Sequence, residues 1–265
     1  MYEFNYHQPT GLDEVANLLG ANAEAKIVAG GMTLVPTLKF RLAKPSDLVD
    51  LAKIPSLRGI TDGGDALVIG AMTRHADVAN SAVVKEVIPA LAALAHLIGD
   101  PAVRHRGTLG GSVANNDPNA DYPAACLGLA ATIITTKRKI TADEFFKGLF
   151  ETALESDEII TKVSFPVPKK AAYQKFKNQA SRFALVGVFV AKRPSEIRVA
   201  VTGAGASGVF RVPEFEVALK KRFAPKSLEG LTIPDDGLAS DIHGSAEYRA
   251  HLVGVLARRA VAAAG

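Results

Sequence analysis

Residues 98–125 read IGDPAVRHRGTLGGSVANNDPNADYPAA and form the most informative stretch of the chain. At its centre, Thr108 to Ser112 (TLGGS) place two adjacent glycines between hydroxyl side chains. Paired glycines let a backbone approach a ligand closely and turn several N–H groups toward an anion. Asp121 follows, and its carboxylate can accept hydrogen bonds from sugar hydroxyls. The alternative is a loop whose Asn and Asp residues merely cap their own backbone.

A second double glycine lies earlier in the chain, at Ala29 to Thr33 (AGGMT). It follows the strand-like residues 26–29 and precedes residues 34–42, which have helical spacing. A helix N-terminus behind such a turn favours an anion such as pyrophosphate. An ordinary strand-to-helix turn is the alternative. Two loops of this kind suit a long ligand with a central diphosphate, held from both sides.

Hydrophobic periodicity outside these loops predicts an α+β fold. Helices are expected at 12–19, 34–42, 83–98, 142–150, 214–222 and 248–263. Strands are expected at 26–29, 47–51, 57–61, 66–71, 130–136, 139–141, 159–165, 173–177, 184–191 and 197–202. The two prolines near residue 166 cannot donate in a central strand, so we expect a boundary there. This predicts a small N-terminal α/β subdomain (1–55), a larger α/β middle subdomain (56–165) and a C-terminal α+β subdomain with a small antiparallel sheet (166–265).

Composition excludes several classes of function. The single cysteine, Cys126, rules out an internal disulfide framework, a thiolate zinc site and an iron–sulfur cluster held by this chain alone. The formal charge of +4 is scattered and has no interleaved aromatic residues, so we expect no nucleic-acid binding. The six histidines show no metal-ligand spacing, and we assign none of them a role. Without a leader or a long apolar run, the chain is expected to be cytoplasmic, with no membrane span.

A third glycine motif, Gly203 to Gly208 (GAGASG), matches the GxGxxG pattern of dinucleotide-binding proteins. It follows a predicted strand, but the next residues, VFRVP, are a poor helix start, and too little chain remains for a mononucleotide-binding half. The motif leaves a stand-alone NAD(P)-dependent dehydrogenase as an alternative function, which these two features disfavour. A cofactor-free assembly subunit is a third.

With both double-glycine loops in place, the chain resembles the FAD-binding medium subunit of molybdenum hydroxylases, the xanthine dehydrogenase and carbon monoxide dehydrogenase family. The resemblance extends over essentially the whole chain, in order and spacing. Its matching stretches are AGGMTLVPTLKFRLAKPSDLVDL (29–51), LVIGAMTRHADV (67–78), the opening stretch (98–125), ETALESDEIITKVSFPVP (151–168) and EYRAHLVGVLARRAV (247–261).

The resemblance implies which residues hold the cofactor. The two loops would hold the FAD pyrophosphate, through Ala29, Gly30, Gly31, Met32 and Thr33 and through Thr108, Leu109, Gly110, Gly111 and Ser112. Asp121 would contact the adenosine half, Ile160 would line the site, and Lys177 and Phe183 would lie near the flavin. Relatives often carry His, Ser and Asn where this chain has Met32, Thr33 and Ser112. Carbon monoxide dehydrogenase-like members have a tyrosine at Phe183. The sequence pattern alone would instead place Phe183 in the core, at the start of an apolar strand.

The activity implied is that of an oxidoreductase subunit. A noncovalent FAD would receive electrons from the two-iron two-sulfur clusters of a small subunit, and a large molybdenum-cofactor subunit would oxidise the substrate. The implied assembly is a dimer of heterotrimers, a heterohexamer. No residue of this chain is expected to be catalytic in the hydroxylation.

Overall fold

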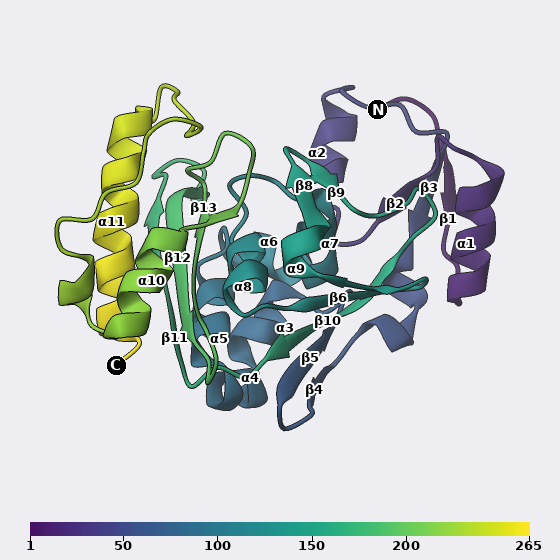
Figure 1. The fold of residues 1–265 in the computed structure, drawn as a ribbon. Helices are drawn as coiled ribbons and strands as arrows, with labels where there is room; N and C mark the ends of the chain where they lie inside the picture. The colour runs from purple at the N-terminus through teal and green to yellow at the C-terminus, as the bar shows by residue number, and fades with distance from the viewer.

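The computed structural model describes residues 1–265, and three large sheets and one two-stranded hairpin lie along its length. Figure 1 shows the N-terminal sheet with helix α1 at one end of the molecule and helix α11 at the other, with the middle sheet between them. This agrees with the predicted α+β class. No helix combines the length and apolar character needed to cross a membrane.

The N-terminal sheet is parallel, with strand order β1-β3-β2. Its strands are β1 (Asn5–His7), β2 (Lys26–Val28) and β3 (Asp47–Asp50), and its helices are α1 (Leu12–Ala21) and α2 (Leu34–Lys39). The short 3₁₀ turns η1 (Leu51–Lys53) and η2 (Pro55–Leu57) follow β3. Helix α1 buries Val15 and Leu19 in one cluster with Val49 of β3. Helix α2 ends three residues earlier than predicted, and Arg41, at φ 59°, has left the helical region.

The middle sheet is antiparallel and has the strand order β4-β5-β10-β6-β7. Its strands are β4 (Ile60–Asp62), β5 (Ala66–Gly70), β6 (Thr132–Thr135), β7 (Lys139–Thr141) and β10 (Ile160–Pro166). The predicted hairpin between β4 and β5 is present, and Gly64 supplies the positive φ of its turn at 81°.

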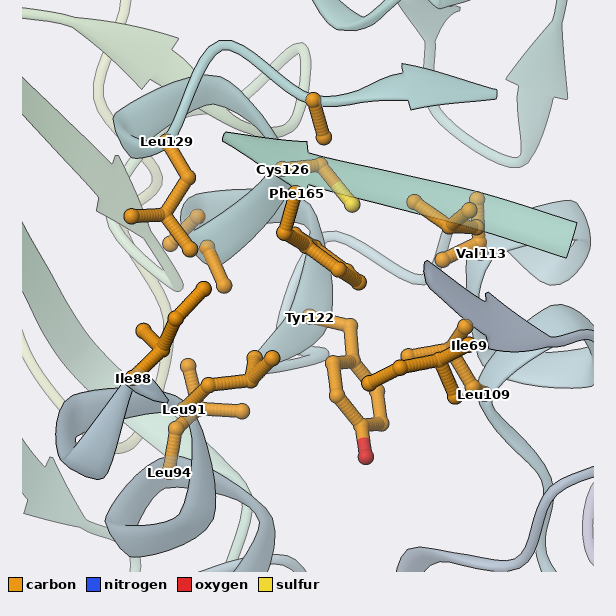
Figure 2. Close-up of a cluster of buried hydrophobic side chains, with 14 of the residues drawn as sticks. Ile69, Ile88, Leu91, Leu94, Leu109, Val113, Tyr122, Cys126, Leu129 and Phe165 are labelled. Atoms are coloured by element: carbon orange, nitrogen blue, oxygen red, sulfur yellow. The ribbon is translucent and has the colours of Figure 1, made fainter. Parts of the chain in front are cut away.

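Six short helices accompany this sheet: α3 (His75–Asn80), α4 (Ala82–Val87), α5 (Pro89–His96), α6 (Pro101–Arg106), α7 (Leu109–Asn115) and α8 (Tyr122–Gly128). Figure 2 shows the core between them, where the Tyr122 ring lies among Phe165, Ile69, Leu109 and Leu91. Cys126 is part of this core, and burial raises the pKa of its thiol, so it is the small buried hydrophobe that its sequence context predicts.

Two helix predictions were wrong. The helix expected at 83–98 is split into α4 and α5, because Pro89 lacks an N–H and disfavours helical geometry at Ile88, whose ψ is 73°. The helix expected at 142–150 ends after one turn, α9 (Ala142–Phe145). A small hairpin, β8 (Phe146–Gly148) and β9 (Glu151–Thr152), follows it. Its tip is held by Asn116, a residue distant in sequence, whose amide donates to the carbonyls of Gly148 and Glu151.

The C-terminal sheet is antiparallel and is covered on both faces. It consists of β11 (Lys170–Lys177), β12 (Ala184–Lys192), β13 (Ile197–Thr202) and β14 (Phe210–Arg211). Alternate residues of β12 point to opposite faces: Val186, Val188 and Val190 join one core, and Phe189 and Ala191 join the other. The first core contains residues of α10 (Pro213–Lys221), η3 (Pro225–Leu228) and α11 (Ala246–Ala263), and the second those of α5 and α8. Packing on both faces explains why β12 is an uninterrupted apolar run.

The predicted limits at residues 55 and 165 remain a prediction. Each large sheet lies within one of the three ranges, except that β10 of the middle sheet extends one residue beyond the second limit, to Pro166. The buried clusters cross both limits. Met72 and Ile159, from the middle range, pack in the core of the N-terminal sheet. Tyr173 and Phe189, from the C-terminal range, pack in the core of the middle sheet and its helices.

Candidate functional site

A pocket of about 650 Å³ opens between the N-terminal sheet, the middle layer and the β11–β12 turn. Pockets that bind cofactors and other small molecules commonly fall in this range of volume. Both double-glycine loops line it, as do Asp121, Ile160 and Phe183. The structure therefore brings together segments that are more than 150 residues apart in sequence.

The two loops touch each other directly. A Cβ atom at Gly30 would lie 2.3 Å from the carbonyl oxygen of Arg106 and 2.6 Å from Cα of Gly107. A Cβ atom at Gly111 would lie 3.2 Å from Cβ of Ala29. Gly30 leaves no room for a side chain against this backbone, and a side chain at Gly111 would press on Ala29. The structure thus shows a packing role for these glycines beside any approach to a ligand.

The first loop has the free donors expected of an anion site. None of the amide N–H groups of Gly30, Gly31, Met32 and Thr33 donates a hydrogen bond within the chain. Gly31 has a φ of 73°, a conformation that side chains other than that of glycine rarely adopt. Unpaired N–H groups that face a pocket favour an acceptor with a negative charge. This loop can therefore donate several hydrogen bonds to a diphosphate.

The second loop differs from the prediction, because most of its amides are engaged inside the protein. Leu109 N donates to the carbonyl of Thr73, and Gly110 N donates to that of Ala71. Gly111 N donates to Oγ1 of Thr108, and Ser112 N donates to its carbonyl. Only Thr108 keeps an amide without an acceptor. This loop can therefore contact a ligand chiefly through the Thr108 N–H and the hydroxyls of Thr108 and Ser112. Its glycines also let a ligand come close to the backbone.

Asp121 lines the pocket but is already engaged. Its side chain is buried, with 4% exposed. The Lys175 ammonium donates to Oδ2 at 2.9 Å, and the Tyr173 hydroxyl donates to Oδ1. Burial raises the pKa of Asp121, and Lys175 and Tyr173 act against that shift. The sequence predicted Asp121 as a ligand of ribose hydroxyls, and the structure shows that it also anchors strand β11 to helix α8.

Two members of the predicted set do not line the pocket. Leu109 is fully buried in the middle core, and Lys177 is exposed at the end of β11. A register shift between Phe176 and Lys177 interrupts the alternation of side chains along this strand. Lys175 is the lysine of β11 that turns inward, and sequence reasoning did not single it out.

Phe183 and Phe150 are exposed aromatic residues at the rim of the pocket. Phe183 is 46% exposed, so the core position suggested by its strand-like context was wrong. Phe150, which sequence reasoning missed, is 60% exposed and has a φ of 54°. The N–H of Phe150 donates to the carbonyl of Asn116, a residue with a φ of 43°. The side-chain amide of Asn116 donates to the same hairpin, at Gly148. A strained and exposed aromatic residue held from two sides is typical of a functional position.

The pocket also contains two titratable groups that the sequence gave no reason to select. Glu158 accepts hydrogen bonds from Arg138, which lower its pKa to about 2. Its charge is thereby balanced by a cation. His75 has only 4% of its surface exposed, and its burial, together with the charge of Arg104, lowers its pKa to about 4. It is therefore neutral at neutral pH.

The GAGASG segment forms no dinucleotide-binding turn. The strand before it, β13, pairs antiparallel with β12 and β14, whereas a Rossmann unit needs a parallel strand that leads into a helix. Gly203 donates to the carbonyl of Pro118, and Ala206 donates to that of Gly237. The segment connects two strands of the C-terminal sheet.

Comparison with known proteins agrees with this geometry. Residues 2–168 match the model of the FAD binding domain in molybdopterin dehydrogenase. The chain belongs to this family. FAD is thus its cofactor, and the four free amides of the first loop and the loop hydroxyls at the pocket fit a dinucleotide with a central diphosphate.

Relatives match the chain over nearly its whole length. The carbon monoxide dehydrogenase medium chain of Hydrogenophaga pseudoflava is 35% identical over 277 residues, which cover 98% of this chain and 96% of that one. The nicotine 6-hydroxylase medium subunit of Paenarthrobacter nicotinovorans is 36% identical over 274 residues, with 98% and 96% covered. In a solved structure of carbon monoxide dehydrogenase from Hydrogenophaga pseudoflava, the matching chain superposes with a TM-score of 0.89 at 34% identity, covering 99% of this chain and 97% of that one. A chain of quinoline 2-oxidoreductase from Pseudomonas putida 86 gives a TM-score of 0.88 at 29% identity, with 99% and 97% covered. The predicted family, fold class and oxidoreductase assignment are confirmed.

Proposed function

We propose that this chain is the electron-relay subunit of a molybdenum hydroxylase complex. It would accept electrons from the two-iron two-sulfur clusters of a small subunit and pass them to an external acceptor, while a large molybdenum-cofactor subunit oxidises the substrate. FAD, when bound, supplies the chemistry that accepts and releases these electrons. The residues of the chain bind the cofactor, orient it and limit access to it.

The observation that carries this proposal is the pocket formed where the two glycine loops meet. It offers donors for a diphosphate and an aromatic rim, but the chain's only cysteine is buried away from it in the middle core. A chain with one cysteine cannot supply the several thiolates of an iron–sulfur cluster, so the clusters of this proposal would belong to another subunit.

The relatives support a role that is independent of the substrate. Medium subunits that are 35% and 36% identical to this chain come from enzymes named for carbon monoxide and for nicotine. Similar flavin subunits thus accompany different oxidations. This pattern fits a subunit that handles electrons and does not bind the hydroxylase's substrate.

In this proposal the predicted contacts that line the pocket keep their roles, whereas Leu109 and Lys177 do not, and the second loop acts mainly through the Thr108 and Ser112 hydroxyls. Ile160 and Phe183 would lie against the ring system or the adenosine, since both line the pocket. We also propose noncovalent binding of FAD, a dimer of heterotrimers and a cytoplasmic location.

Purification of the tagged chain from its native cells tests the proposal. We expect flavin, iron and molybdenum to copurify in fixed ratios with two further subunits. The separated chain should retain FAD and lack hydroxylase activity. A homo-oligomer that copurifies with no metal-containing subunit would contradict the electron-relay role and leave the FAD assignment intact.

A further inference from the structure

His75 lies where the two glycine loops meet. Its Nε2–Cδ2 edge faces Gly107: a Cβ atom at Gly107 would lie 2.6 Å from Nε2 and 2.8 Å from Cδ2. Gly107 also packs against Gly30 of the first loop and immediately precedes Thr108 of the second. His75 N donates to the carbonyl of Gly107 at 3.0 Å, which fixes the backbone beside the ring. The imidazole itself lines the pocket.

The two ring nitrogens have different surroundings. Nδ1 is buried and has no hydrogen-bond partner, and the neighbouring aromatic ring is that of Tyr122, 5.4 Å away between centroids. A neutral imidazole carries one proton, on either nitrogen. A proton on Nδ1 would bury a donor without an acceptor and would turn the Nε2 lone pair toward an anionic ligand. A proton on Nε2 avoids both penalties and directs a donor toward the pocket.

The second loop has few backbone donors of its own, because four of its five amides are already bonded within the protein. Opposite it, the first loop presents four free amides. We propose that His75 is a cofactor-binding residue, present as the neutral Nε2–H tautomer, which donates a hydrogen bond from Nε2 to the diphosphate of FAD on the second-loop side. This inference rests on the proposed position of the diphosphate between the two loops.

The test compares His75→Leu, which removes the donor, with His75→Gln, whose amide nitrogen can occupy the position of Nε2. His96→Leu is the matched control, because His96 is exposed at the end of α5 and does not line the pocket. FAD affinity is measured by fluorescence titration of the deflavinated protein. We expect His75→Leu to weaken binding by about ten- to a hundredfold, as for a hydrogen bond to a charged group. We expect His75→Gln and His96→Leu to stay close to the wild type.

Two spectroscopic measurements add readouts besides affinity, and the first of them needs no variant. In the FAD-bound wild type, ¹⁵N NMR should show a protonated Nε2 and an unprotonated Nδ1 for His75. In ³¹P NMR, the resonances of the bound diphosphate should shift in His75→Gln and not in His96→Leu. A proton on Nδ1, or wild-type affinity in a folded His75→Leu protein, would overturn the inference.

Gly31→Val separates this inference from the placement of the diphosphate. If the diphosphate lies between the loops but His75 does not contact it, Gly31→Val loses FAD while His75→Leu keeps it. If Gly31→Val also binds FAD normally, the placement itself is wrong.

Discussion

The Lys175 ammonium lies 2.9 Å from Oδ2 of Asp121, and both side chains are almost completely buried. The pair joins strand β11 of the C-terminal sheet to the residue that precedes helix α8. Lys175 also donates to the carbonyl of Leu97, and Tyr173 donates to the other carboxylate oxygen. One carboxylate thus holds two layers of the protein together at the edge of the cofactor pocket.

Asp121→Ala should therefore destabilise the fold as well as weaken FAD binding. A contact with the adenosine half alone would predict weaker binding without unfolding, but the substitution would also leave Lys175 as a buried cation without its carboxylate. Breaking a buried pair from one side typically costs about 3–5 kcal/mol. Urea unfolding should show this loss for Asp121→Ala, whereas the double variant Asp121→Asn with Lys175→Met should recover much of it. Equal losses in the single and double variants would mean that the ion pair contributes little.

Gly31→Val should abolish FAD binding. Gly31 has a φ of 73°, and its Cβ would lie 3.0 Å from a methyl carbon of Val35, so a β-branched residue would displace the amides of the first loop. Gly11→Ala is a suitable control, because no atom lies within 4 Å of its Cβ position. The flavin absorption of the purified proteins gives the answer, with circular dichroism to confirm folding.

In the GAGASG segment, Gly205→Val would be an unsuitable control for FAD binding. A Cβ there would lie 2.3 Å from the carbonyl oxygen of Gly208 and 2.9 Å from the Phe210 ring, so the variant would disturb the sheet. Ala206→Val changes an exposed residue of the same segment. It should bind FAD like the wild type, and loss of flavin from this folded variant would revive the dinucleotide reading of the segment.

The flavin-free chain should lose stability between about pH 6.5 and pH 4 because of His75. Its pKa falls from the usual 6.5 to about 4 in the folded state, so the unfolded chain binds the additional proton. The stabilisation is complete above pH 6.5 and is lost as the pH falls through 4. The difference amounts to roughly 3 kcal/mol. Urea unfolding across this range should show a flatter pH dependence for His75→Leu than for the wild type or His96→Leu.

The parts of the fold that the sequence predicted are those that local patterns determine. Helix α1 and strands β5, β12 and β13 follow from periodicity, and the two loops follow from glycine pairs at the ends of predicted elements. Interactions between distant residues decided the rest. Asn116 stabilises a hairpin where the sequence suggests a helix. Lys175 points inward on the same face as Tyr173, and the register shift after Phe176 leaves Lys177 exposed.

The site shows the same division between local and distant interactions. The glycine pairs were recognisable in the sequence, but their packing role was not. Gly30 and Gly111 allow the two loops to touch, and Gly110 packs against Ala71. His75 could not be selected from the sequence, because an isolated histidine shows neither its burial nor the nitrogen that faces the pocket. Only the contact with Gly107, more than 30 residues away, reveals its position.

Asn116→Ala should loosen the hairpin that carries Phe150. The substitution removes two hydrogen bonds, to Gly148 and Glu151, and puts alanine at a φ of 43°, which asparagine tolerates better. We expect a loss of about 2–3 kcal/mol and faster hydrogen exchange at residues 148–152. Asn116→Gly keeps the backbone conformation accessible and still lacks the amide, so it separates strain from hydrogen bonding. Unchanged hydrogen exchange at residues 148–152 in both variants would show that Asn116 does not hold this hairpin in place.

Phe183→Ala should alter the flavin and leave the fold nearly unchanged. Phe183 is 46% exposed at the pocket rim, so its removal should cost less than about 1 kcal/mol, compared with about 3–5 kcal/mol for a phenylalanine in a core. If the Phe183 ring lies against the isoalloxazine, its loss should change the shape of the visible flavin spectrum. It should also speed oxidation of the reduced protein by oxygen, because face or edge contact with the phenylalanine limits access to the reactive part of the flavin. Phe183→Tyr should restore the wild-type spectrum, since it retains the ring and adds only a hydroxyl. Val217→Ala, at an exposed apolar residue outside the pocket, is the control for general surface effects. A Phe183→Ala protein with wild-type stability, spectrum and oxidation rate would show that the side chain does not contact the flavin.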